Sequence, residues 1–295
     1  MTKKGNNTKR GSVLIAGGGI GGMQAALDLA DSGFKVHMIQ KDPSIGGTMS
    51  MLDKTFPTGD CSMCMISPKM VEVGRHPNIV LHTLSEVTGV EGEPGDFTVT
   101  VHEQPRYVDA EKCTGCGACE KKCPKLVVSE FEQGLSKRKA IYSLLPQAVP
   151  NTRVIDPVNC LYLQRGRCKA CVKFCDANAI NFDDTAKDYQ LQVGAIILSP
   201  GADRYDPKIR PELGFGRWPN VVTSLQFERL LSASGPCGGE VARPSDEAHP
   251  KKLAWIQCVG SRDIQCEADF CSTVCCMIAI KEALLVKEKL KQPVE

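Results

Sequence analysis

The stretch that decides the fold is residues 12–40, SVLIAGGGIGGMQAALDLADSGFKVHMIQ. A short apolar strand, predicted over 13–16, runs into Gly17, Gly19 and Gly22, which form a G-x-G-x-x-G pattern. A helix over 23–31, closed by Gly33, and a second strand over 35–39 complete a β-α-β unit. In this order the glycines lie where a pyrophosphate meets a helix N-terminus, so the stretch predicts a dinucleotide site. A glycine turn without a ligand is the alternative.

The end of the second predicted strand departs from the usual pattern. That strand commonly ends in Glu or Asp, which holds the ribose hydroxyls, whereas here it ends in Gln40, with Lys41 and Asp42 behind it. The amide of Gln40 can still hydrogen-bond a hydroxyl, although it carries no charge. Gly46 and Gly47 follow, where flavoproteins often place a second backbone contact to the diphosphate.

A later strand returns the chain to this domain. Residues 194–198, GAIIL, read as a buried strand that ends in Ser199-Pro200-Gly201. Two-domain flavoproteins of the thioredoxin-reductase type have such a strand at this point. We therefore expect an α/β, Rossmann-like domain that binds FAD, with Gly201 and Asp206 near the flavin. The Gly- and Pro-containing stretch 234–250 is typical of a linker.

Two cysteine runs between these strands indicate iron–sulfur chemistry. The first has the C-x2-C-x2-C-x3-C-P spacing of ferredoxins, and the second follows as C-x7-C-x2-C-x3-C, with Asp176 in place of the usual proline. In two-cluster ferredoxins the last cysteine of each run crosses to the other [4Fe–4S] cluster. This rule predicts a first quartet of Cys113, Cys116, Cys119 and Cys175, and a second quartet of Cys123, Cys160, Cys168 and Cys171. Zinc is the alternative metal, but it prefers two separated C-x2-C pairs.

A third group of cysteines follows a second Rossmann-like start. A strand predicted over 253–256 enters a loop where a nicotinamide-binding domain would carry its glycines, and a helix is predicted over 274–290. The third quartet comprises Cys258, Cys271, Cys275 and Cys276. We infer that a cluster replaces the pyrophosphate at this helix N-terminus, whose positive end suits an anion, and that the unit does not bind NAD. Four unrelated buried thiols are the alternative.

Four cysteines stand outside the quartets. Cys61 and Cys64 form a C-x2-C in a predicted loop, which fits a redox dithiol beside a flavin, half of a metal site, or two buried structural thiols. The structural interpretation comes slightly ahead of the dithiol. Cys237 and Cys266 remain unassigned.

Composition narrows the class of protein. The 295 residues carry a formal net charge of +2, which argues against nucleic-acid binding. Residues 2–12 are polar and basic, and the apolar core of a signal peptide does not follow them. No apolar run is long enough to cross a membrane. We expect a cytoplasmic protein, in which 16 cysteines indicate metal or redox work rather than disulfides.

These features divide the chain into five parts. We expect a disordered tail at 1–11, the first part of the FAD-binding domain at 12–104, and an inserted two-cluster ferredoxin domain at 105–185. The return to the FAD domain and a linker occupy 186–250, and the start of the second Rossmann-like unit occupies 251–295.

Together these motifs resemble the A-type subunit of heterodisulfide reductase. The resemblance covers about residues 12 to 295 and is most specific at residues 54–58 (KTFPT), 60–64 (DCSMC), 68–72 (PKMVE), 137–142 (KRKAIY) and 258–263 (CVGSRD). It implies FAD, three [4Fe–4S] clusters in this chain and flavin-based electron bifurcation. Lys281 matches a family lysine near the flavin N5, where a cation would stabilise reduced flavin; an ordinary exposed lysine is the alternative.

The resemblance also implies partners. These are B- and C-type subunits of a heterodisulfide-reductase-like complex, a hydrogenase, formate dehydrogenase or NADH-oxidising module, ferredoxin, and a second copy of this chain within the complex. The chain lacks the N-terminal domain of methanogen-type members and ends at Glu295, so it is expected to be a shortened, split or partial member. Two other functions stay open: a thiol/disulfide oxidoreductase that uses Cys61 and Cys64, and a non-bifurcating iron–sulfur wire.

Overall fold

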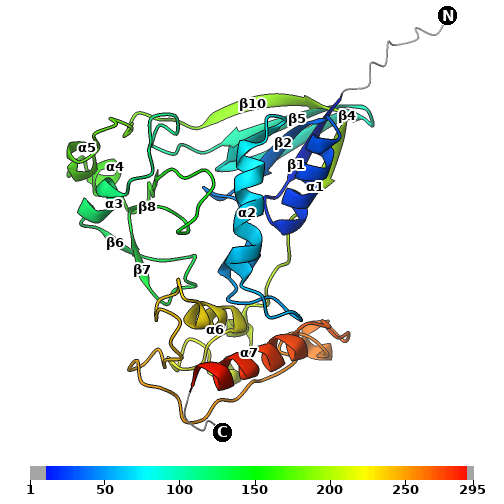
Figure 1. Ribbon diagram of the computed structural model, residues 1–295, viewed down its shortest axis with the longest axis vertical. Helices are drawn as coiled ribbons and strands as arrows, with labels where there is room; N and C mark the ends of the chain where they lie inside the picture. Colours follow the sequence, from blue (N-terminus) through cyan, green and yellow to red (C-terminus); the bar gives the residue numbers. More distant parts are fainter. Residues whose placement is uncertain (1–10, 291–295) are drawn as a thin grey trace, which may run out of the picture. The chain divides into compact units, whose positions relative to one another are not determined.

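The computed structural model describes residues 11–290, which divide into two compact units. Unit 1 holds the chain up to Met49 together with Ile66–Val127 and Lys137–Gly201, and unit 2 holds Ser50–Met65, Val128–Ser136 and the residues from Ala202 onward. Each unit contains segments that are far apart in the sequence, so each is described by itself (Figure 1). The tail expected at 1–11 lies outside the described residues except for its last position.

A parallel sheet forms the centre of unit 1. Its strand order is β11-β1-β2-β3, with β1 Ser12–Ala16, β2 Lys35–Gln40, β3 Ile79–Thr83 and β11 Ala195–Leu198. The late strand β11 pairs in parallel with β1, as the predicted return to the domain requires. Because side chains alternate along a strand, Leu14 faces one side of the sheet while Ile15 faces helix α1 (Ile20–Asp31) on the other.

A second, antiparallel sheet covers the Leu14 face. It has the order β10-β5-β4, with β4 Ser85–Glu93, β5 Asp96–Glu103 and β10 Lys187–Val193. Val99, Val101 and Val193 from this sheet pack with Leu14 and Ile39 of the parallel sheet, and all five are buried. Helix α1 lies along β1 and β2 and buries its apolar residues, among them Met23, Ala26 and Leu27 (Figure 1). The β-α-β unit predicted from residues 12–40 is confirmed.

The ferredoxin-like insert also belongs to unit 1 and is built from short elements. These are the helices α3 Ala118–Lys122, α4 Leu161–Arg165 and α5 Ala170–Lys173, and the strand pairs β6 Leu126–Val128 with β7 Lys137–Lys139, and β8 Ile141–Tyr142 with β9 Val154–Ile155. Its core contains Val108, Cys119, Ile141, Ile155 and Ala179, and cysteines of both runs pack against this core. The cysteines therefore take the place that bulky apolar side chains fill in a larger domain.

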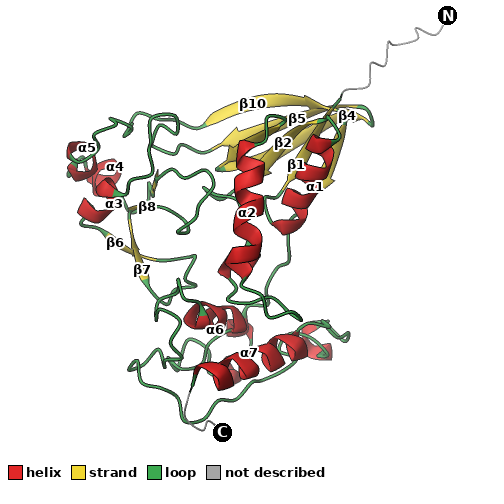
Figure 2. Ribbon diagram, viewed as in Figure 1, coloured by secondary structure: helices red, strands yellow, loops and turns green. Residues whose placement is uncertain are grey.

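Unit 2 is organised by two helices joined by long loops (Figure 2). Helix α6 Ser224–Leu231 begins with a capping box between Thr223 and Gln226, and helix α7 Cys275–Lys289 lies within one residue of its predicted range. Leu230 and Leu231 of α6 pack with Leu285 and Val286 of α7. Helix α2 Ser62–Arg75 belongs mostly to unit 1. The 3₁₀ turns of the chain are η1 Thr48–Met51, η2 Pro207–Ile209, η3 Pro211–Leu213 and η4 Ile264–Cys266.

The prediction of a strand over residues 253–256 is wrong. The side chains of this segment alternate as they would in a strand, since Leu253 and Trp255 pack on the α6–α7 core while Ile256 is exposed, but no strand forms there. In the described part of unit 2 no neighbouring strand supplies the ladder of hydrogen bonds that a strand needs. The stretch expected to be a linker is also partly packed, because Val241 is buried against the same core.

Candidate functional site

The glycine loop between β1 and α1 is tight at two positions. Gly17 has φ +113°, and a Cβ there would lie 2.0 Å from the carbonyl oxygen of Ser199, just after β11. Gly22 lies equally close to the glycine loop, since a Cβ at Gly22 would lie 2.0 Å from the carbonyl oxygen of Gly17. Only glycine lets these backbones approach so closely. The pattern read from the sequence is therefore required by the geometry.

The start of α1 suits an anion. The first N–H groups of an α-helix lack intrahelical partners, and here no side chain caps Gly19 and the first turn of α1 holds no acidic residue. These N–H groups and the helix dipole favour a negatively charged group. A diphosphate such as that of FAD fits this donor set.

Gln40 is buried and holds the glycine loop. Its Oε1 accepts a 2.7 Å hydrogen bond from the Gly18 N–H, and its Nε2 donates a 2.7 Å bond to Asp42 Oδ2. Burial raises the pKa of the Asp42 carboxyl, while Lys41 and the Gln40 amide oppose that rise. One N–H and one lone pair of the amide remain for a ribose hydroxyl. Gln40 thus stabilises the loop itself, a role that the sequence did not suggest.

The second glycine pair lies against the first loop. The Gly46 N–H donates a 2.8 Å bond to the Gly18 carbonyl, and a Cβ at Gly47, where φ is +57°, would lie 3.0 Å from the Gly19 Cα. The Val149 carbonyl of the insert accepts a 3.0 Å bond from the Ile45 N–H, and the Val149 N–H donates a 2.9 Å bond to Ser44 Oγ. The insert therefore holds the loop that carries Gly46 and Gly47.

The two remaining residues expected near the flavin differ in setting. Gly201 follows β11 with φ +80°, and a Cβ there would meet no atom within 4 Å. Asp206 is exposed in unit 2 and caps η2 by accepting a 3.0 Å bond from the Lys208 N–H. Its contact with FAD stays a prediction.

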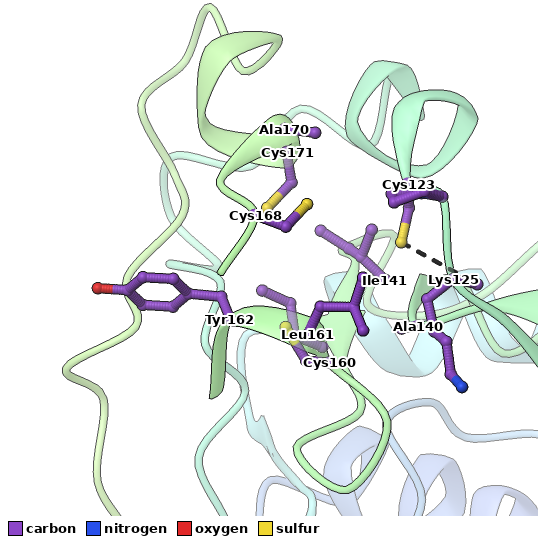
Figure 3. A pocket seen from close by; sticks show the side chains of 12 residues that line it. Cys123, Lys125, Ala140, Ile141, Cys160, Leu161, Tyr162, Cys168, Ala170 and Cys171 are labelled. Atoms are coloured by element: carbon purple, nitrogen blue, oxygen red, sulfur yellow. Dashed lines mark hydrogen bonds between the residues drawn. The ribbon is translucent and has the colours of Figure 1, made fainter. Parts of the chain in front are cut away.

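The four cysteines of the second quartet surround one hollow in the insert. Cys123, Cys160, Cys168 and Cys171 line it together with Ile141 and Leu161, and Figure 3 shows them around this space. They come from both cysteine runs, as the crossing rule of two-cluster ferredoxins predicts. The pKa of the Cys171 thiol is raised to about 12, mainly by burial and in part by the nearby thiols of Cys160 and Cys123.

The first quartet lies beside the second. The pKa of the Cys119 thiol is raised to about 11, mainly by burial and in part by the nearby thiols of Cys175 and Cys113. Cys116 is exposed, and its thiol pKa is lowered mainly by the Ala118 N–H and also by the Thr114 side chain.

Backbone N–H groups also reach the first quartet's sulfur atoms. The Ala179 N–H donates to Cys175 Sγ at 3.3 Å. Hydrogen bonds of this kind tune a cluster's reduction potential. Cys119 also influences the pKa of Cys171 in the other quartet, so the two sets of thiols are neighbours within the insert.

The third quartet gathers at the start of α7. The thiol pKa of Cys276 is raised by Cys275 first, and also by Cys258 and Cys271. The Cys258 backbone N–H lowers the pKa of the Cys275 thiol, and the Thr273 N–H donates to Cys271 Sγ at 3.3 Å. Cys271 and Cys276 are exposed and the other two half-buried, so the alternative of four buried thiols is wrong.

The described residues contain neither a site for a single metal ion nor a membrane-spanning helix. In residues 11–290 no three His, Cys, Asp or Glu side chains close around a single metal ion. Within the same residues no helix is long and apolar enough to cross a membrane.

Comparison with known proteins agrees with both halves of this site. Residues 12–60 match a family described as FAD dependent oxidoreductase, and residues 106–129 match a 4Fe-4S binding domain. The second A-type iron-sulfur subunit of the CoB–CoM heterodisulfide reductase of Methanopyrus kandleri is 54% identical over 276 residues, which is 94% of this chain. Over 94% of its own length the chain is similar to A-type heterodisulfide reductase subunits.

Two further similar proteins carry more specific names. The A-type subunit of the H(2):CoB-CoM heterodisulfide,ferredoxin reductase of Methanothermobacter marburgensis is 48% identical over 94% of this chain. The corresponding subunit of the H(2)/formate:CoB-CoM heterodisulfide,ferredoxin reductase of Methanococcus maripaludis is 47% identical over 94%. This chain spans 41% of the length of each of these three relatives.

The C-x2-C that helped to indicate the heterodisulfide reductase family lies at the start of α2. Both Cys61 and Cys64 are exposed, so the expectation of buried structural thiols is wrong. The Cys64 N–H donates to Cys61 Sγ at 3.3 Å, and hydrogen bonding to Cys61 raises the pKa of the Cys64 thiol. A short bridge between Lys54 and Cys61 positions the preceding loop.

Lys281, which the resemblance predicts to lie near the flavin N5, is not an exposed lysine. Its side chain is 8% exposed, forms a 2.5 Å ion pair with Glu228, and donates a 2.8 Å bond to the Lys54 carbonyl. Glu228 in turn accepts a 3.0 Å bond from the Asp53 N–H. Helices α6 and α7 thus hold the loop that leads to the C-x2-C. The distance from Lys281 to a flavin stays a prediction.

Sequence reasoning missed the other charged groups that are buried in unit 2. Arg229 is fully buried and makes a two-point ion pair with Glu132 at 2.9 and 3.0 Å. Glu282 accepts a 2.8 Å bond from the Trp255 indole N–H, and burial raises the pKa of its carboxyl to about 8. The signal that could have found Glu228 and Glu282 is position, because they lie where α6 and α7 face each other.

Proposed function

We propose that the chain is an FAD- and iron–sulfur-containing electron-transfer subunit of a heterodisulfide-reductase-like complex. In this role it takes two electrons from a donor and divides them between ferredoxin and a disulfide-reducing partner. The observation that carries the proposal is the gathering of the second quartet, from two separate cysteine runs, around one hollow. The glycine cradle of the same unit supports the flavin half of the proposal.

The residues of unit 1 have defined parts in this proposal. The N–H groups at the start of α1 would bind the diphosphate of FAD, and Gln40 would offer its remaining N–H to the ribose. Gly46 and Gly47 would keep the second side of the diphosphate open to backbone contact. Bound FAD accepts two electrons together and can release them singly.

The cysteines would hold three [4Fe–4S] clusters in the arrangement predicted from the sequence. The first and second quartets are neighbours in the insert, which supports electron transfer between their clusters. The third quartet would hold its cluster at the N-terminus of α7, whose dipole favours an anionic group. Lys281 would act as the cation that stabilises reduced flavin, and Lys281→Met is then expected to lower the flavin's midpoint potential.

The relatives' names supply the proposed partners. Two of them include ferredoxin, one names H2 as donor and another names H2 or formate. By this likeness the complex would contain B- and C-type subunits, a hydrogenase, formate dehydrogenase or NADH-oxidising module, and a second copy of this chain. We propose a cytoplasmic location for the complex.

The decisive experiment measures cofactors and potentials on protein purified without oxygen. One FAD and about twelve iron atoms per chain are expected, since each of three clusters contributes four. A spectroelectrochemical titration should then show a second one-electron reduction of the flavin that is easier than the first. A full iron load without flavin absorbance would refute the proposal and favour an iron–sulfur wire. Uncrossed flavin potentials would remove bifurcation and leave simple electron transfer.

The exposed C-x2-C supports a second candidate function, that of a thiol/disulfide oxidoreductase. Its two cysteines are in contact and accessible, as a redox dithiol requires. Replacing both Cys61 and Cys64 with Ser should then abolish electron transfer from reduced flavin to a small disulfide. The matched control is Cys237→Ser, a half-buried cysteine outside the quartets. If the double variant oxidises flavin and reduces its clusters like the unmodified protein, the dithiol function fails.

A further inference from the structure

The surface around the second quartet is strongly basic. Between Cys160 and Cys175 the chain carries four cations and no acidic residue: Arg165, Arg167, Lys169 and Lys173. All four are exposed, and in the described chain none of them forms an ion pair with a carboxylate. Lys122 of α3, which contacts α5, is exposed as well. We call these five residues the α4–α5 basic surface.

The insert as a whole has the same bias. Residues 105–185 contain 13 Lys and Arg against nine Asp and Glu, whereas the complete chain has 36 against 34. The rest of the chain is therefore slightly acidic. A positive excess confined to one part of a near-neutral protein creates a local field that attracts negatively charged partners.

The basic surface has an apolar centre. Val172 is 39% exposed and Phe174 is 45% exposed, although each is next to a cysteine of the insert in the sequence. The Lys122 ammonium lies 5.0 Å from the centre of the Phe174 ring, and the Lys169 ammonium lies 4.6 Å from that of Tyr162. These contacts hold two cations over aromatic rings. An apolar centre with a charged rim is the composition of a protein interface rather than of a solvated face.

The surface also gives access to the quartet. Cys168 is exposed, has φ +80°, and lies between Arg167 and Lys169 in the sequence. The same cysteine lines the hollow of the second quartet, as Figure 3 shows. A protein docked on the α4–α5 basic surface would therefore reach the edge of the cluster that this quartet holds.

We propose that the α4–α5 basic surface is the docking site of a small acidic one-electron carrier protein. The inference rests on the proposed function, because it needs a cluster in the second quartet. In the proposed function one electron leaves the reduced cluster and enters the carrier, so the cluster is oxidised by one electron and the carrier reduced by one; no bond or proton moves. The test below follows the same transfer in the reverse direction, from reduced carrier to oxidised cluster. Charge attraction speeds the encounter, and Val172 and Phe174 form the contact. Such electron-transfer contacts are small and transient.

The test uses the complete chain with its cofactors and a ferredoxin of strongly negative net charge. Two quantities are measured: the Kd by titration calorimetry, and the bimolecular rate of cluster reduction by stopped-flow absorbance. Both are followed from about 20 mM to about 300 mM salt, a range over which screening becomes strong. The unmodified chain should lose at least tenfold in rate across this range, since steering contributes about 10- to 1,000-fold.

Charge reversal identifies the surface. Arg165→Glu with Arg167→Glu should weaken binding and slow reduction at least tenfold at low salt, and should remove most of the salt dependence. The matched control is Lys187→Glu with Lys251→Glu, two exposed lysines outside the surface, which should change the rate less than twofold. If the first variant loses iron, Lys169→Gln with Lys173→Gln serves instead and should give about a threefold loss.

Several outcomes would overturn the inference. An unchanged Kd and rate in the surface variants would do so, as would an equal loss in the control. Binding of the surface to anionic lipid vesicles or to inorganic phosphate, with no effect on the ferredoxin rate, would show a different ligand. If dithionite reduces the flavin and clusters normally in each of these cases, the proposed function still stands; missing flavin or iron in the unmodified chain would instead refute that function.

Discussion

Gly22→Ala is the sharpest test of the dinucleotide cradle. An alanine Cβ at this position would lie 2.0 Å from the Gly17 carbonyl oxygen and 3.3 Å from Ile15 Cγ2. The obstructing oxygen is backbone, so no side-chain rotation relieves the clash. Carbon and carbonyl oxygen approach to about 3.3 Å at best, so the loop or the helix must shift by more than about 1 Å.

The size of the effect follows from two opposing terms. In a helix interior Ala is favoured over Gly by about 0.5–1 kcal/mol. Forcing an extra carbon into a packed site costs about 1–3 kcal/mol, and displacing the loop adds the loss of its contacts. We therefore expect a net destabilisation of about 1–2 kcal/mol, or about 2–8 °C in Tm. The same shift would displace the N–H groups that are expected to bind the diphosphate.

Gly21→Ala is the matched control. It lies next to Gly22 in the same first turn of α1, and its added Cβ would meet no atom within 4 Å. This variant should keep its flavin and gain slightly in Tm. The assay is thermal unfolding together with the ratio of FAD to protein after gel filtration. If Gly22→Ala retains full FAD and the Tm of the control, the close approach of Gly22 to the loop is not what shapes this site.

Three further predictions concern the rest of the chain. Arg229→Met should destabilise unit 2 by about 3–5 kcal/mol in urea unfolding because it leaves the largely buried carboxylate of Glu132 unpaired, whereas Arg243→Met, at an exposed pair, should cost less than about 1 kcal/mol. The pKa of the Glu282 carboxyl is about 8 in the folded state, above its unfolded value of about 4.5, so between these pH values the folded state binds a proton that the unfolded state does not. The free energy of unfolding should therefore fall as the pH rises from about 4.5 to 8. Glu282→Gln should flatten this fall, as measured by the urea midpoint at each pH. Cys168→Ser should remove about four iron atoms per chain, while Cys237→Ser should remove none, as measured by iron assay; equal losses would contradict the assignment of the second quartet.

Local patterns in the sequence were sufficient to predict the fold of unit 1. The G-x-G-x-x-G loop depends on a strand and a helix that adjoin it, so residues 12–40 contain most of the information that sets their conformation. The position of Cys123 beside the cysteines of the second run could be predicted for a similar reason. Two runs with ferredoxin spacing allow little freedom in which thiols meet. These are cases in which short-range geometry determines the result.

Unit 2 could not be read in the same way because its features depend on long-range contacts. Lys281 meets the Lys54 carbonyl across 227 positions, and Arg229 meets Glu132 across 97. No local periodicity indicates that a charged side chain of a helix is buried against a distant partner. The expected strand at 253–256 failed for a related reason, since its apolar alternation was correct but a strand also requires a paired neighbour.

The hydrogen bonds of Val149 explain why the flavin cradle and the insert belong to one unit despite their separation in the sequence. Gly18 binds Gly46, Ser44 and Ile45 bind Val149, and these bonds form an unbroken backbone path from the glycine loop to the insert. Each bond contributes only about 1 kcal/mol, but a buried path leaves its N–H groups unsatisfied if the insert moves away. A displacement of the insert would therefore disturb the loop of Gly46 and Gly47. An electron carrier docked on the α4–α5 basic surface would bind a part of the chain that is connected by these hydrogen bonds to the proposed flavin site.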